Sequence, residues 1–240
     1  MKPFKVTTKQ LTPIILGNNS PNLAGILYHC CLLHTGSETD AKELLESLLL
    51  TTDGIYNASD AIFEVSPSQQ LIAAKITTNG IMNDSDLSSE RLNTKPMKNG
   101  KYKPIETKGG PFKNRVNKHK AYLAQNITFY GYGEIEKIVK LLNHYIFCVG
   151  LNANTGFGNV GEWTYIETNE DHSFIAPTNL NCPKFMLVNR VPLTSKLTEQ
   201  FNNYSLEAVT KKRQLKPPFN RDQISINCYV GNRINKALEA

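Results

Sequence analysis

The sequence lacks several features that would place the protein in a membrane or outside the cell. It contains no apolar run near the roughly 20 residues that a membrane-spanning helix needs. Its first residues, MKPFKVTTKQ, lack the apolar core of a secretory signal peptide. Its five cysteines are odd in number and form no paired disulfide framework. We therefore expect a cytoplasmic protein that is not attached to a membrane.

Acidic residues are scarce in one stretch of the chain. The 240 residues are 40% hydrophobic and 20% charged, as in soluble globular proteins, and the net charge is +6. Between positions 90 and 120 the only acidic residues are Glu90 and Glu106. The basic residues there are Arg91, Lys95, Lys98, Lys101, Lys103, Lys108, Lys113, Arg115, Lys118 and Lys120. Such a concentration predicts polyanion binding, and a solvated loop without a partner is the alternative.

The hydrophobic pattern predicts strands and helices without strict alternation, which is typical of the α+β class. The expected strands are 4–8, 13–16, 61–65, 70–78, 126–133, 162–168, 184–193 and 225–230. The first expected helix is 22–34, preceded by Ser20 as N-cap and Pro21 at the N1 position. The second begins at Asp40, which forms a capping box with Glu43, and the third is 134–149. We expect strands 61–65 and 70–78 to pair. Residues 83–120, here called the basic segment, predict a long loop or extended hairpin inserted into a single domain of residues 1–240.

Residues 156–161, GFGNVG, spell G-x-G-x-x-G. In dinucleotide-binding proteins this motif follows a strand and opens a helix, whereas here it follows a predicted helix and precedes a predicted strand. The partner motifs of a protein kinase are also absent from the sequence. The order strand, helix, glycine-rich loop, strand instead matches the end of a ferredoxin-like βαββ unit, the framework of RNA-recognition domains.

A longer pattern in this region carries a family resemblance. Gly150, Gly156, Phe157, Gly158 and Val160 form G-x-x-x-x-x-G-[FY]-G-x-V. This pattern resembles the glycine-loop signature of the RAMP (repeat-associated mysterious protein) superfamily of CRISPR effector subunits.

Other stretches are similar to one branch of that superfamily, the subunit that caps the 5′ end of the guide RNA. PNLAGILYH resembles its P-x-L-D-G-L-L segment, with Ala24 in place of aspartate, and GIYNASDAIF resembles its Y-x-A-S segment. NRVPL resembles its R-x-x-P strand end, and KPPFN resembles P-P-Y-W, with Asn220 in place of tryptophan. The chain is most similar to the version from type IV systems, from Pro21 to about Tyr229.

The resemblance implies a non-catalytic RNA-binding subunit with a ferredoxin-like core, whose basic segment forms a thumb. Its implied partners are the 5′ handle of the guide RNA (crRNA) and the backbone and large subunits of an effector complex, while contact with target DNA is left open. No metal or cofactor is expected. The candidate RNA-binding residues are Gly150, Asn152, Asn154, Thr155, Gly156, Phe157, Gly158, Asn159, Lys101, Tyr102, Lys103, Lys113, Arg115, Lys118, His119, Lys120, Tyr56, Ser59 and Arg190.

The residue types agree with this interpretation. Glycine has no Cβ, so its backbone can approach a phosphate chain closely. The loop's asparagines and Thr155 add neutral hydrogen-bonding groups suited to phosphate and 2′-hydroxyl contacts. Tyr102, Phe112 and Tyr122 lie among the basic residues and offer stacking surfaces for unpaired bases. The alternatives are that the glycines only form a tight turn and that the aromatic residues only anchor the loop.

Two enzyme-like features remain. His29, Cys30, Cys31 and His34 have helical spacing, but no second ligand pair completes a zinc site, so we interpret them as part of a core helix. His119 among lysines could act as a general base in RNA cleavage. A guide-processing endoribonuclease of the same superfamily is therefore the alternative function, and a general single-stranded RNA-binding protein is another.

Overall fold

The structure is a computed structural model that describes residues 1–17, 20–65, 72–80, 97–101, 115–179, 182–198, 208–219, 225–231 and 237–239. The chain divides into two compact units. The larger unit comprises Met1–Ala73 and Tyr122–Ala240, and the smaller comprises Ala74–Ala121. The fold is α+β, with mostly antiparallel strands and three α-helices among the described residues.

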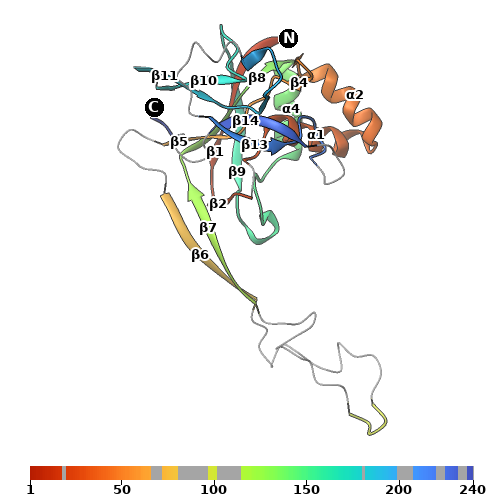
Figure 1. Ribbon diagram of the computed structural model, residues 1–240. Helices are drawn as coiled ribbons and strands as arrows, with labels where there is room; N and C mark the ends of the chain where they lie inside the picture. The colour runs from red at the N-terminus through yellow and green to blue at the C-terminus, as the bar shows by residue number, and fades with distance from the viewer. Residues whose placement is uncertain are drawn as a thin grey trace. The chain divides into compact units, whose positions relative to one another are not determined.

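The centre of the larger unit is a seven-stranded sheet of order β11-β10-β15-β5-β8-β1-β9 (Figure 1). Its strands are β1 (Lys2–Gln10), β5 (Ile62–Val65), β8 (Asn126–Gly133), β9 (Val160–Glu167), β10 (Ile175–Asn179), β11 (Cys182–Leu187) and β15 (Ala237–Glu239). Strand β1 is antiparallel to both β8 and β9, and β8 is antiparallel to β5. It follows that β8 and β9 are parallel to each other, with β1 between them.

Two strand–helix–strand connections build this part of the sheet. The chain passes from β8 through helix α4 (Ile135–Tyr145) to β9, across the intervening β1. It also passes from β1 through α1 (Leu23–Thr35) and α2 (Glu38–Leu48) to β5, across the intervening β8. Each connection is a βαβ unit split by one strand.

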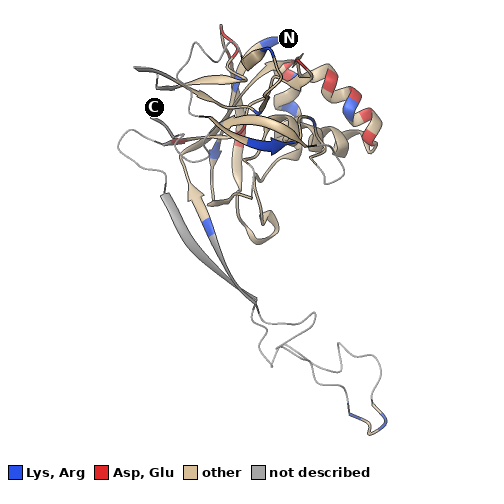
Figure 2. Cartoon of the chain, viewed as in Figure 1, with Lys and Arg blue, Asp and Glu red and all other residues tan. Residues whose placement is uncertain are grey.

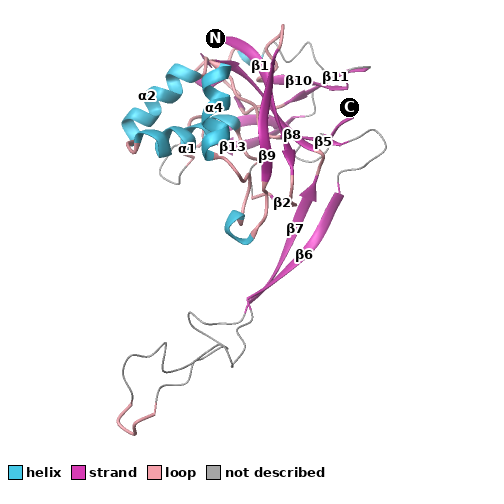
Figure 3. Cartoon of the chain, turned by 180° about the vertical axis from the view of Figure 1, so that it is seen from behind, coloured by secondary structure: helices cyan, strands magenta, loops and turns pink. Residues whose placement is uncertain are grey.

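The helices cover one face of the sheet (Figures 1 and 3). The alternation along β1 sends Phe4 and Val6 into the core beneath them, and α4 adds Ile138 and Leu142 from its apolar side. Trp163 of β9 is among the largest fully buried side chains of the described residues. A smaller hydrophobic cluster brings together side chains from β5, β8, β10 and β11. Its members are Ile62, Tyr130, Ala176, Met186 and Val188, which follows β11.

The predicted helix caps are wrong, although both helices exist. Asn22 caps α1, because its side-chain oxygen accepts a hydrogen bond from the backbone N–H of Ala24 at 3.0 Å. Ser37 caps α2 by accepting from the N–H of Asp40, which therefore lies inside the helix. The Asn22 amide also donates to Asp60 Oδ1 at 2.9 Å, a contact distant in sequence that favours Asn22 over Ser20.

The predicted strand 184–193 is two strands. It breaks at Val188–Arg190 into β11 and β12 (Val191–Pro192). Strand β12 then pairs with β14 (Ile226–Gly231), which pairs with β13 (Ala208–Arg213), a strand not predicted from the sequence. Short strands β2 (Ile14–Ile15), β3 (Thr51–Thr52) and β4 (Ile55–Tyr56) complete the larger unit.

The smaller unit contains most of β6 (Ile72–Gly80) and β7 (Arg115–Leu123), which are neighbours in one sheet. The predicted pairing of residues 61–65 with 70–78 is therefore wrong, since β5 pairs with β8 and β15 instead. Of the basic segment, residues 83–96 and 102–114 lie outside the described residues. Its last residues, 115–120, are part of β7.

Candidate functional site

The glycine loop, residues 150–159, connects the end of α4 to the start of β9. Its path depends on left-handed backbone conformations at Gly150, Asn152, Gly156 and Gly158, with φ of 100°, 62°, 87° and 72°. A short 3-10 helix, Ala153–Thr155, lies in the middle of the loop. The predicted order of helix, glycine-rich loop and strand is confirmed.

Backbone hydrogen bonds fix the two ends of this loop to the N-terminal part of the chain. The N–H of Leu151 donates to Ile15 O at 2.9 Å, and the N–H of Gly158 donates to Pro13 O at 2.9 Å. The N–H of Val149 donates to Gly158 O at 2.8 Å. The base of the loop is therefore part of the folded scaffold, and the Gly158 N–H already has a protein acceptor.

The glycines differ in their surroundings. A Cβ added at Gly158 would overlap the carbonyl oxygen of Val149, and one at Gly150 would lie 2.7 Å from Ile14 Cγ1. A Cβ at Gly156 would meet no atom within 4 Å. Gly158 and Gly150 thus serve close packing within the protein, while the space beside the Gly156 Cα is open and its N–H donates to Ala153 O at 3.0 Å.

The polar side chains of the loop also divide into two groups. Asn152, Asn154 and Thr155 are exposed at the tip. Asn159 is half-buried, where its Oδ1 accepts from Cys148 Sγ at 3.0 Å and its N–H donates to Thr12 Oγ1 at 2.9 Å. Phe157 is buried beneath the tip. The surface available for contact is therefore residues 151–156, which we call the loop tip.

The predicted contact residues of the basic segment are only partly described. Lys101 and Lys120 are exposed. Arg115, Lys118 and His119 belong to β7, but the structure does not describe their side chains. Tyr102, Lys103 and Lys113 lie outside the described residues.

Tyr56, Ser59 and Arg190 are buried and hold the fold together. Ser59 Oγ accepts from the N–H of Tyr130 at 2.8 Å. The Arg190 guanidinium lies 3.3 Å from Asp60 Oδ1, and burial raises the pKa of Tyr56 to about 12. Ser59 and Arg190 therefore connect neighbouring elements, as is expected of buried polar groups that have partners.

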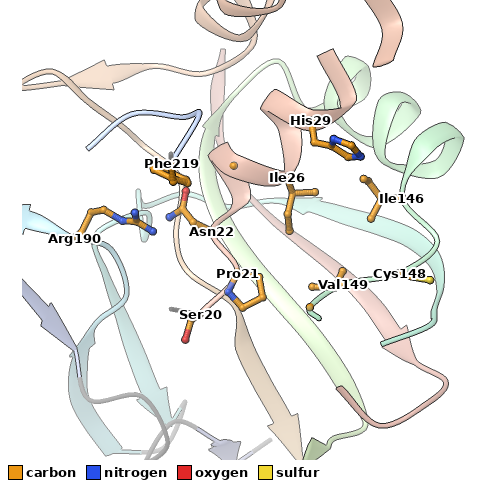
Figure 4. A pocket seen from close by; sticks show the side chains of 12 residues that line it. Ser20, Pro21, Asn22, Ile26, His29, Ile146, Cys148, Val149, Arg190 and Phe219 are labelled. Carbon is orange, nitrogen blue, oxygen red and sulfur yellow. The ribbon is translucent and has the colours of Figure 1, made fainter. Parts of the chain in front are cut away.

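A pocket with a volume of about 350 Å³ lies among α1, the start of the glycine loop and residues near Arg190 and Phe219. Figure 4 shows Arg190 and Phe219 on one side and Ile146, Cys148 and Val149 on the other. Ile26 and His29 of α1 also line it. The sequence did not predict this pocket, because Gly25 and Phe219 meet only in the fold. The stretches PNLAGILYH, NRVPL and KPPFN all contribute to its lining, but nothing in the sequence indicates that they come together.

A second basic element was also missed. Lys211, Lys212 and Arg213 end the strand β13, and both lysines are exposed (Figure 2). Residues 208–219 contain no acidic residue and a fourth cation, Lys216. These four basic residues are visible in the sequence, but the basic segment contains more of them and was predicted to be the binding element instead.

The described residues bear on two further features, metal binding and membrane-spanning helices. Cys30 and Cys31 are buried in the core, and burial raises the pKa of these thiols to about 12 and about 11. Across the described part of the chain, no three His, Cys, Asp or Glu side chains gather in a way that could hold a metal ion. No helix of that part is long and apolar enough to cross a membrane.

No protein-family model matches the chain, and no curated protein is similar enough to match it.

Proposed function

We propose that this chain is a RAMP-superfamily subunit of a type IV CRISPR effector complex that binds the guide RNA and caps its 5′ handle without cutting it. The observation that carries the proposal is the loop tip. It exposes Asn152, Asn154 and Thr155 around an open Gly156, directly between an amphipathic helix and a strand. Exposed neutral side chains and the open space beside Gly156 suit a sugar–phosphate chain bound without base reading.

The strand order supports a ferredoxin-like core. Strands β9, β1, β8 and β5 are neighbours in that order, and the two split βαβ connections interlock through them. Two interlocked βαβ units on one antiparallel sheet are the topology of the ferredoxin-like fold, which RNA-recognition domains share. In this proposal strands β10, β11 and β15 extend that core, and the basic segment is its thumb.

The charge distribution supports a nucleic-acid partner. Lys101 and Lys120 are exposed in the smaller unit, and Lys211 and Lys212 are exposed in the larger one. Helix α2, in contrast, carries four acidic residues, Glu38, Asp40, Glu43 and Glu46 (Figure 2). We infer that the basic segment clamps the RNA and meets the adjacent backbone subunit of the effector.

The test compares two RNAs of equal length, one with the repeat-derived 5′ handle of the same genome and one with that handle scrambled. The wild-type protein should bind the first more tightly. Asn154→Glu adds a carboxylate to the loop tip without disturbing a buried contact, so it should weaken binding several-fold at low salt, and less as salt screens the repulsion.

Ser47→Glu is the matched control, because it adds the same charge at an exposed position of α2. Equal affinity of the two variants for the handle RNA would show that the loop tip is not part of the binding surface. Equal affinity of the wild type for both RNAs would reject the role as handle cap and leave general RNA binding.

A further inference from the structure

The pocket beside the glycine loop has the size and composition of a small-ligand site. Its volume of about 350 Å³ falls within the range of such sites, roughly 300–1,000 Å³. Gly150, the first residue of the glycine loop, lines it together with Ile26 and Val149. An RNA chain bound at the loop tip and a group bound in this pocket would therefore contact neighbouring residues of the same loop.

One wall of the pocket is flat and held in place. The Arg190 guanidinium carbon lies 4.4 Å from the centroid of the Phe219 ring. Arg190 is only 4% exposed, donates to Gln214 O at 3.1 Å and is paired with Asp60. The ring packs on α1 at Gly25, where an added Cβ would lie 2.8 Å from it.

The chemistry of these walls selects a flat, uncharged group. The charge of Arg190 is compensated by Asp60, so the pocket does not present a free cation to an anion. The apolar side chains of Ile26 and Val149 face the space opposite the aromatic wall (Figure 4). A nucleobase fits both properties, because it stacks on aromatic rings and carries no charge.

The segment that delivers Phe219 is cationic. Lys211 and Lys212 are exposed on β13, and the chain continues from there through Lys216 to the pocket without an acidic residue. Lys216 Nζ lies 3.9 Å from Glu46 and 5.3 Å from the Tyr56 ring centroid. The lysines of β13 are exposed and precede the pocket residue Phe219 closely in the sequence.

We propose that this pocket takes one unpaired base of the bound RNA and that β13 contacts the phosphates beside it. The inference rests on the proposed RNA-binding function and adds to it a specific position of the RNA that the protein holds by its base.

The experiment is an abasic scan. Each nucleotide of the handle RNA is replaced in turn by an abasic one, and the affinity is measured for wild type, Phe219→Leu and Phe219→Tyr. In the wild type one position should lose affinity by about 5- to 150-fold, the effect of removing one base–aromatic stack. In Phe219→Leu that penalty should disappear, because the ring is already absent. Phe219→Tyr keeps an aromatic ring, so this variant should show the same penalty as the wild type.

Phe147→Leu is the control, because Phe147 is the most exposed aromatic side chain of the described residues and does not line the pocket. It should leave the penalty at that position unchanged. Thermal melts that match the wild type establish that both leucine variants are folded.

The outcomes separate the two proposals. If the wild type binds the RNA but no abasic penalty is removed in Phe219→Leu, the pocket does not hold a base and the proposed function still stands. If the wild type does not bind the RNA at all, the proposed function fails and this inference fails with it.

Discussion

The side-chain amide of Asn143 in α4 pairs with the backbone of Trp163 in β9 as a neighbouring strand would. Asn143 Oδ1 accepts from the N–H of Trp163 at 2.8 Å, and its Nδ2 donates to Trp163 O at 3.0 Å. The indole N–H of Trp163 donates to Ile146 O at 3.0 Å. The helix before the glycine loop and the strand after it are therefore held together independently of the loop.

Replacing Asn143 should destabilise the protein while leaving its fold intact. In Asn143→Ala both backbone groups of Trp163 are left without this partner, which should cost about 1–3 kcal/mol in the free energy of unfolding. Urea denaturation measures the change. Lys140→Ala on the exposed side of the same helix is the control and should stay within about 0.5 kcal/mol of wild type. Equal stability of the two variants would contradict a structural role for the pair.

Gly156 and Gly158 should respond differently to the same substitution. Both have positive φ, so alanine strains the backbone at either position, by about 1 kcal/mol at the open Gly156. At Gly158 the new Cβ also overlaps Val149 O, and the destabilisation should reach about 3 kcal/mol or more. Thermal melts of the two variants test this order. If both variants have the same melting temperature, the close packing at Gly158 is not as the structure describes it.

Strongly periodic segments could be predicted from the sequence, whereas the contacts between them could not. Helix α4 was predicted from its regular apolar spacing, and strand β9 from its content of aromatic and β-branched residues. The spacing of residues 134–149 does not reveal that the Asn143 amide replaces a strand partner of Trp163.

The N-cap of α1 shows the same limit. Ser20 and Asn22 are both suitable capping residues, and the contact with Asp60 that distinguishes them is distant in sequence. The candidate site shows the same difference between local segments and distant contacts. The loop tip could be predicted from its glycines, but the pocket depends on the packing of Phe219 against Gly25.

The stability of the protein should decrease in alkaline solution. Burial raises the pKa of the Cys30 and Cys31 thiols to about 12 and about 11, whereas unfolded cysteine ionises near about 8.5. Above that pH the unfolded chain releases protons that the folded chain retains, so the free energy of unfolding falls by up to about 1.4 kcal/mol per pH unit for each thiol. Urea denaturation between about pH 8 and 10.5, under reducing conditions, measures this slope.

Cys30→Ala provides the comparison for this pH dependence. It removes one of the two thiols and should make the slope shallower, even if the variant is less stable at every pH. An unchanged slope would show that Cys30 ionises alike in the folded and unfolded states.

Neutralising the basic segment should reduce the salt dependence of RNA binding. Changing Lys113, Arg115, Lys118 and Lys120 to glutamine should weaken binding to all sequences, because these cations would contact phosphates. The slope of log K against log salt should fall by about 0.7 for each single-strand phosphate that the protein no longer neutralises.

The control carries the same change in net charge at Lys42, Lys137, Lys140 and Lys196, which are exposed in the larger unit. If the two quadruple variants have equal slopes, net charge rather than the basic segment determines binding.

The proposal that the subunit does not cut RNA concerns His119. A histidine acting as general base would give cleavage that rises as its imidazole loses a proton, across the pH range about 5 to 9. We expect purified protein to leave repeat RNA intact over that range, as judged by denaturing gels with end-labelled RNA. His119→Ala serves as the matched variant, and it should bind with a slope reduced by no more than about 0.7, since one imidazole neutralises at most one phosphate. Site-specific cleavage by the wild type that disappears in His119→Ala would establish the endoribonuclease alternative, because a contaminating nuclease would cut equally in both preparations.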